Sequence, residues 1–208
     1  MNKTDKENLL HKIIELDKEL TKLEESELKT YCVDHHKGVY YCFKLIKNRH
    51  WVSYIGFPKH INVNNKKYYY LDQVNEDSYH LEPRDRVNFE LPSEITLQSC
   101  GMDVNVMSDV PLDWIGFDYA HRGDLTVGEL KKIFKKIPED VIIDINSLDG
   151  YNLDKYDIKT LQNDKFYTYE DVKKDCIDCI NSATQCLIEK ALSDLKSNLN
   201  REINKNNK

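Results

Sequence analysis

Two runs of aromatic and β-branched residues near the start of the chain constrain its fold most strongly. Residues 38–46 read Gly-Val-Tyr-Tyr-Cys-Phe-Lys-Leu-Ile, and residues 51–57 read Trp-Val-Ser-Tyr-Ile-Gly-Phe. Such side chains suit the half-buried, pleated surface of a sheet, and the four residues between the runs are enough for a hairpin turn. Pro58 ends the second run because it has no N–H to donate to a neighbouring strand. The sequence therefore predicts an antiparallel hairpin.

Further strands are predicted where apolar residues alternate or cluster in short runs. They fall at residues 87–91, 95–99, 113–117 and 141–145. The polar segments between the predicted elements are expected to be loops, at residues 59–85, 100–111 and 146–166. The doublet His35-His36 is likewise expected in an exposed loop before the first strand, because turn-forming residues surround it.

Helical periodicity marks three segments, at residues 4–28, at residues 126–137 and from Thr168 to about Leu199. The first carries a heptad seam that either docks on the protein's own core or pairs with a second copy. The seam consists of Leu9, Ile13, Leu16, Leu20 and Leu23. The last begins with a capping box of Thr168 and Asp171. We expect it to cover the sheet with Ile177, Cys179, Ile180 and Leu187.

These elements define an α+β fold, with a mostly antiparallel sheet packed by a long C-terminal helix and an added N-terminal amphipathic helix. We divide the chain into the helix at 1–28, a single α+β domain at 29–199 and a charged tail at 200–208 that we expect to fray. The 13 Tyr, 6 Phe and 2 Trp can build a core although 32% of the 208 residues are charged.

Charge and hydropathy exclude several classes of protein. The net charge of -6 argues against binding nucleic acid along a phosphate backbone. No apolar run reaches the roughly 20 residues that span a bilayer, and the charged N-terminus lacks the apolar stretch of a signal peptide. We therefore expect a cytoplasmic protein.

Six cysteines form no framework typical of a disulfide-rich scaffold. Cys176 and Cys179 form a C-x-x-C pair, but they lie inside a helical stretch with no second pair and no histidine nearby. Zinc needs four ligands, and redox pairs usually sit at a helix N-terminus after a strand. We interpret these cysteines as reduced core thiols and expect neither metal nor cofactor.

One segment, residues 114–124, has the character of a ligand site, because it passes from a predicted strand into a polar turn between glycines. Trp114, Phe117 and Tyr119 offer flat stacking surfaces. Arg122 suits phosphate, since its planar fork donates two parallel hydrogen bonds. Asp118, His121 and Asp124 suit a metal or a carboxylate-oriented general base. In the structural alternative, Asp124 caps the following helix and His121 is a histidine whose hydrogen bonds are made within the protein.

The same segment carries a resemblance. The order Tyr54-Ile55-Gly56-Phe57-Pro58, then Trp-Ile-Gly-Phe-Asp-x-Ala-His-x-Gly-Asp at residues 114–124, then Thr-x-Glu-Asp-Val from Thr168 resembles a family of small uncharacterised phage and prophage proteins. Those proteins also carry a His-Gly-Gly-Leu-Thr-like element between the first two motifs. This chain has Glu94-Ile95-Thr96-Leu97 instead, without the histidine and glycines.

The resemblance implies a phage-encoded accessory protein and supplies no known reaction. The leading hypothesis is an anti-defence protein that sequesters a small nucleotide-type immune signal of the host, in the host cytoplasm, without chemistry. The site would comprise Trp114, Phe117, Asp118, Tyr119, His121, Arg122 and Asp124. The alternatives are an inhibitor that binds a host protein and a metal-dependent nucleotide hydrolase using Asp118, His121 and Asp124. Signatures such as G-x-S-x-G and the P-loop are missing, which favours a protein that is not an enzyme.

Overall fold

The structure is a computed structural model that describes residues 2–25, 31–46, 50–70, 95–100, 112–137, 148 and 151–206. The strands expected at 87–91 and 141–145, the turn at 47–49 and the loop at 101–111 lie outside the described residues. The chain forms two compact units. The first comprises Met1–Cys32, Phe43–Ser53 and Asp118–Lys173, and the second comprises Val33–Cys42, Tyr54–Phe117 and Lys174–Lys208.

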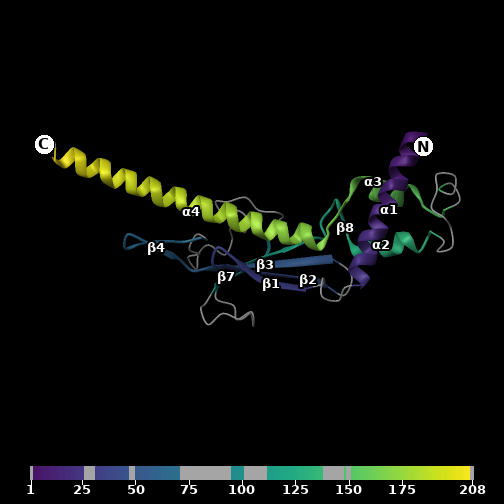
Figure 1. Ribbon diagram of the computed structural model, residues 1–208, viewed down its shortest axis with the longest axis horizontal. Coiled ribbons are helices and arrows are strands. Elements are labelled where there is room, and N and C mark those ends of the chain that lie inside the picture. Colours follow the sequence, from purple (N-terminus) through teal and green to yellow (C-terminus); the bar gives the residue numbers. More distant parts are fainter. Residues whose placement is uncertain are drawn as a thin grey trace. The chain divides into compact units, whose positions relative to one another are not determined.

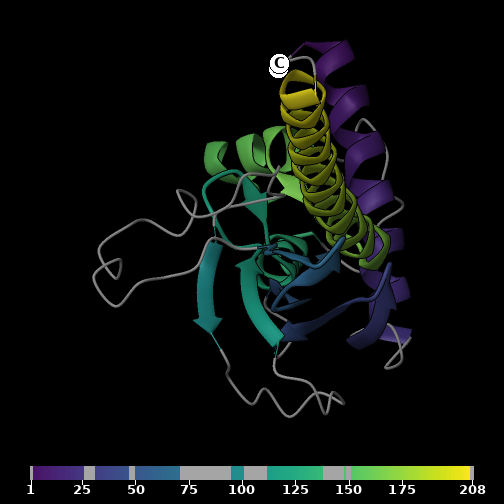
Figure 2. The same ribbon diagram turned by 90° about the vertical axis from the view of Figure 1, so that its left-hand side faces the viewer.

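The second unit holds most of a five-stranded sheet with the order β1-β2-β3-β7-β6. The strands are β1 (Tyr31–His36), β2 (Val39–Ile46), β3 (His50–Pro58), β6 (Ile95–Cys100) and β7 (Leu112–Asp118). The predicted hairpin of β2 and β3 is confirmed, and β6 pairs antiparallel with β7, with Ser99 opposite Trp114. The helix α4 (Tyr169–Asn206) packs on this sheet (Figures 1 and 2), so the predicted α+β class is confirmed.

Two hairpins occupy segments that we expected to be loops. Lys37 and Gly38, with φ of 50° and 76°, turn β1 into β2. The doublet at 35–36 therefore belongs to a strand, and His36 Nε2 lies 2.9 Å from Asn181 Oδ1 of α4. Asn64 and Asn65, with φ of 48° and 61°, turn β4 (Ile61–Val63) into β5 (Lys66–Tyr68). Paired positive φ angles twist a two-residue turn to match the twist of the strands.

The long helix α4 begins as predicted, at a capping box. Asp171 N donates to Thr168 Oγ1 at 3.2 Å, and Thr168 N donates to Asp171 Oδ2 at 2.9 Å. Cys179, Ile180 and Leu187 are buried as expected, whereas Ile177 is half-buried. The helix continues to Asn206, so most of the tail expected to fray from residue 200 is helical.

The C-x-x-C pair lies in the buried face of α4. Cys176 and Cys179 are 0% and 2% exposed, and neither forms a disulfide. Burial raises the pKa of the Cys179 thiol to about 12, with a smaller contribution from the nearby Asp175 carboxylate. Because the thiolate is the reactive form, we expect the buried Cys179 thiol to react slowly in the folded protein.

We therefore expect native protein at pH 8 to leave Cys176 and Cys179 unmodified by iodoacetamide. Denatured protein should label at both positions, which provides the control. Peptide mass spectrometry measures the modification of each cysteine. Labelling of Cys179 in the native protein at the rate seen in denaturant would contradict the buried, protonated thiol.

A close contact joins the two glycine-containing strand motifs. A Cβ added at Gly56 of β3 would lie 2.8–2.9 Å from three ring atoms of Trp114 in β7. Trp114 is buried and belongs to a small core cluster with Cys42 and Leu112. The absence of a side chain at residue 56 thus lets the indole ring lie against the backbone of the neighbouring strand.

Replacing Gly56 with Ala should destabilise the protein, because a rigid buried ring must move to admit the methyl group. Overpacking of this kind costs about 1–3 kcal/mol, measurable by urea denaturation. The double variant Gly56→Ala/Trp114→Leu should be more stable than the sum of the two single changes predicts, because the smaller side chain removes the clash. Strict additivity would show that the contact does not limit residue 56.

The first unit gathers the helices α1 (Lys3–Glu25), α2 (Val127–Phe134) and α3 (Lys155–Asn163). The heptad seam of α1 is buried, from 0% exposed at Ile13 to 8% at Leu23, and α1 contacts α3. Glu24 of α1 also pairs with Lys131 of α2 at 2.9 Å. The seam therefore docks on the protein's own core. Among the described residues, no helix is long and apolar enough to cross a bilayer.

Candidate functional site

The aromatic side chains predicted to stack on a ligand lie in the core. Trp114 and Phe117 are 2% and 1% exposed on β7, and Tyr119 is 3% exposed just beyond it. The Tyr119 ring contacts the Tyr167 ring edge-on, with 4.6 Å between the ring centroids. These side chains fill the interior and leave no face for a ligand, which corrects the stacking role expected of them.

The polar half of the segment forms a loop fixed by short-range hydrogen bonds. Tyr119 N donates to Trp51 O at 3.0 Å, which fixes the start of the loop to β3. Two hydrogen bonds between Asp124 and His121 close the turn. The Asp124 carboxylate accepts from His121 N at 2.9 Å, and Asp124 N donates to His121 O at 3.0 Å. Gly123 supplies the positive φ of 98° that this turn requires.

The end of the loop is tied to a distant part of the chain. The two-residue strands β8 (Asp124–Leu125) and β9 (Lys165–Phe166) pair in parallel, and Lys165 N donates to Gly123 O at 2.8 Å. Directly after β8, Thr126 caps α2 in a capping box with Glu129. Helix α2 was predicted from the sequence at 126–137 and is confirmed, although its regular part ends at Phe134.

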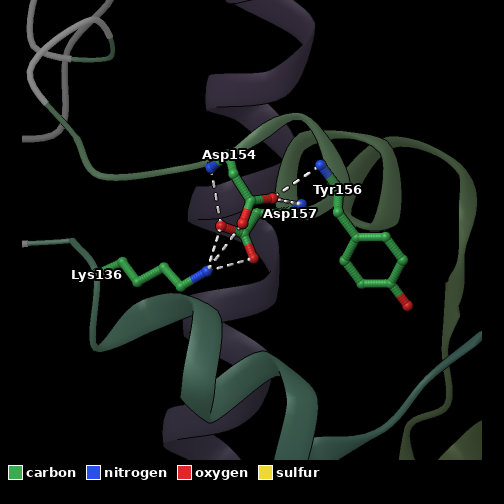
Figure 3. Close-up of polar contacts among 4 residues, drawn as sticks. All are labelled: Lys136, Asp154, Tyr156 and Asp157. Carbon is green, nitrogen blue, oxygen red and sulfur yellow. Dashed lines mark hydrogen bonds and ion pairs between the residues drawn. The ribbon is translucent and has the colours of Figure 1, made fainter.

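Helix α3 provides the opposite side of the site, where we expected a polar loop over 146–166. Asp154 caps this helix by accepting from Tyr156 N at 2.8 Å and Asp157 N at 2.9 Å. Asp157 is buried and accepts from Asp154 N at 3.0 Å. Lys136 Nζ reaches both carboxylate oxygens of Asp157, at 2.6 and 2.8 Å (Figure 3). The hydrogen bond to Asp157 is the main reason that the pKa of Lys136 is raised.

A cleft of about 620 Å³ lies between this loop and α3. It is lined by Ala120, His121, Arg122, Gly123, Asp124, Glu129, Tyr156, Lys159, Thr160 and Asp164. His121, Arg122 and Asp124 were predicted as site residues, and the structure brings them together on one side. Sequence reasoning missed Tyr156, Lys159, Thr160 and Asp164 because α3 was not recognised.

The charged side chains of the cleft differ in whether they already form a hydrogen bond or an ion pair within the protein. The Asp124 carboxylate accepts from His121 N, and the Glu129 carboxylate accepts from Thr126 N at 3.1 Å and Thr126 Oγ1 at 2.8 Å. Within the described part of the chain, the side chains of Arg122, Lys159 and Asp164 form no ion pair or hydrogen bond. Two cations and one carboxylate are therefore available to a ligand.

Asp118 does not line the cleft, but its carboxylate lies close to the His121 side chain. Its Oδ1 is 3.3 Å from His121 Nε2, close enough for an ion pair when the imidazole is protonated. Across the described residues, no three His, Cys, Asp or Glu side chains are grouped so that they could hold a metal ion. Asp118, His121 and Asp124, the three ligands of the expected alternative, are therefore not grouped as a metal centre.

Comparison of the chain with protein-family models, curated proteins and solved structures finds no match. The site is therefore defined by its own geometry.

Replacing Asp157 with Ala should destabilise the protein and loosen the α3 side of the cleft. The change removes half of the capping box and leaves Lys136 without its main partner, which should cost about 1–3 kcal/mol. Removal of the Asp178 carboxylate provides a matched control, because this group forms an exposed ion pair with Lys174 on α4. The free energy of unfolding should then fall by less than about 0.5 kcal/mol. Equal effects in thermal and urea unfolding would show that the buried cap does not hold α3.

Proposed function

We propose that this chain is a binding protein for a small phosphate-bearing ligand of the nucleotide type, which it holds in the cleft between the 120–124 loop and α3. The observation that carries the proposal is the pair of cations, Arg122 and Lys159, that have no side-chain partner among the described residues. An arginine fork and a lysine ammonium are strong donors to phosphate oxygens.

Other groups in the cleft suit the rest of such a ligand. The Tyr156 side chain lines the cleft and is 70% exposed, so its ring is available to stack on a base. Thr160 follows Lys159 on α3, is buried and lines the same cleft. Asp164 is a carboxylate acceptor for ribose hydroxyls. Because Asp124 and Glu129 add two further carboxylates to the lining, the phosphate is expected to lie against the two cations, Arg122 and Lys159.

The proposed role is capture without chemistry. Capture is favoured over metal-dependent cleavage because, within the described residues, no three His, Cys, Asp or Glu side chains are grouped as metal ligands. The resemblance to a family of phage proteins directs the search toward nucleotide signals of host immunity, so a phage-encoded protein that sequesters such a signal is the hypothesis to test. A surface that inhibits a host protein remains the alternative for a protein that binds no nucleotide.

Isothermal titration with a panel of linear and cyclic mono-, di- and trinucleotides tests the proposal. Arg122→Ala and Lys159→Ala should each weaken binding of the captured nucleotide about 10- to 100-fold, the usual effect of losing a charge-assisted hydrogen bond. Lys132→Ala removes an exposed lysine of α2 that does not line the cleft and should leave binding unchanged. Failure to bind any member of the panel, or equal weakening by all three changes, contradicts the proposal.

A second candidate, hydrolysis, is favoured by one observation, the 3.3 Å approach of Asp118 to His121. His121 lines the cleft, and a carboxylate beside an imidazole is the pairing that general-base catalysis uses. Chromatography of ligand released by heating separates the two functions, since a sequestering protein returns it intact and a hydrolase returns product. His121→Ala should abolish any cleavage, whereas an intact ligand after prolonged incubation supports capture alone.

A further inference from the structure

The C-terminal half of α4 carries a row of exposed apolar side chains. Ile188, Leu192, Leu195 and Leu199 are 45%, 59%, 37% and 57% exposed, although large aliphatic side chains normally gain stability from burial. Their spacing of four, three and four residues is that of a heptad seam. We call this row the α4 seam.

The α4 seam is separate from the face by which the same helix packs on its own unit. That other face uses Leu187 and Ala191, which are buried with Tyr68 of the β4–β5 hairpin. Asp194 adds a hydrogen bond with Lys66 of the hairpin. Figure 1 shows that the last turns of α4 continue past this hairpin. The helix is therefore fixed along one side and presents a second apolar side.

The charges beside the α4 seam select how two copies of it can pair. With Leu192 and Leu199 at position a and Ile188 and Leu195 at position d, Glu189 and Lys196 occupy successive e positions. In an antiparallel pair the e positions of the two helices face each other, so Glu189 of each copy meets Lys196 of the other. In a parallel pair e faces g, where the chain has Thr184 and Ala191 and no charge.

The geometry points to an antiparallel dimer, and we propose that α4 pairs with α4 of a second copy of this chain along the α4 seam. Leu192 would pack opposite Leu195 of the second copy, and Ile188 opposite Leu199. Residues 188–206 hold four basic and three acidic residues, so this stretch does not share the acidic excess of the chain. The helix is already formed, so pairing does not require the costly nucleation that makes short isolated coiled coils unstable.

Sedimentation equilibrium over low to high micromolar concentration tests the dimer. The unaltered chain should reach twice its mass of 24.5 kDa. Leu192→Glu places a carboxylate in the middle of the seam and should keep the protein at the mass of one chain, with an unchanged circular dichroism spectrum because residue 192 is exposed. Ser193→Glu adds the same charge one residue away, on the exposed side opposite the seam, and should leave the dimer intact.

Charge reversal tests the direction of the pairing. Glu189→Lys alone and Lys196→Glu alone turn two attractive pairs into two repulsive ones and should each raise the dissociation constant about 10-fold. The double variant Glu189→Lys/Lys196→Glu restores opposite charges and should restore the dimer. A single-chain mass for the unaltered protein overturns the proposal, as does a dimer that persists in Leu192→Glu. Failure of the double variant to recover affinity overturns the antiparallel arrangement.

Discussion

The contacts of Trp51 hold together the parts of the first unit that position the cleft. Its backbone carbonyl accepts from Tyr119 N, at the start of the cleft loop, and its indole Nε1 donates to Tyr167 O at 2.9 Å, just after β9. The indole ring also meets Phe43 and Tyr169 edge-on. One residue of β3 thereby contacts segments of the chain that are more than 100 residues apart. The segment that contains the loop and α3 is therefore held to Trp51 at both of its ends, before the loop at Tyr119 and after α3 at Tyr167.

Local sequence patterns predicted the elements whose signals are local. The β2–β3 hairpin, α2, the start of α4 and the antiparallel sheet follow from apolar periodicity and capping residues, and all are present. The elements that were not predicted are short, and their sequence signals are correspondingly weak. The capping box of Asp154 and Asp157 marks the start of α3, and the Asn64-Asn65 pair marks the turn between β4 and β5. Both signals are visible in the sequence but lie in segments that are otherwise polar.

The sequence predicted only the loop side of the candidate site, and the reason is physical. His121, Arg122 and Asp124 are adjacent in the sequence, so a polar turn after a strand was enough to identify them. Lys159 and Asp164 reach the same cleft through the parallel pairing of β8 with β9, a long-range contact that no local pattern encodes. The stacking role of Trp114 and Phe117 failed because the aromatic residues of a buried central strand are needed to fill the core.

Glycine is favoured at both Gly56 and Gly123, but for opposite reasons. At Gly56 the backbone is ordinary and the space is occupied by the Trp114 ring. At Gly123 the space is open, with nothing within 4 Å of an added Cβ, and the backbone conformation is the obstacle. Asparagine tolerates positive φ better than other residues with a side chain. The chain should therefore accept asparagine in place of Gly123 by a single exchange, whereas residue 56 can change only together with the residue at 114.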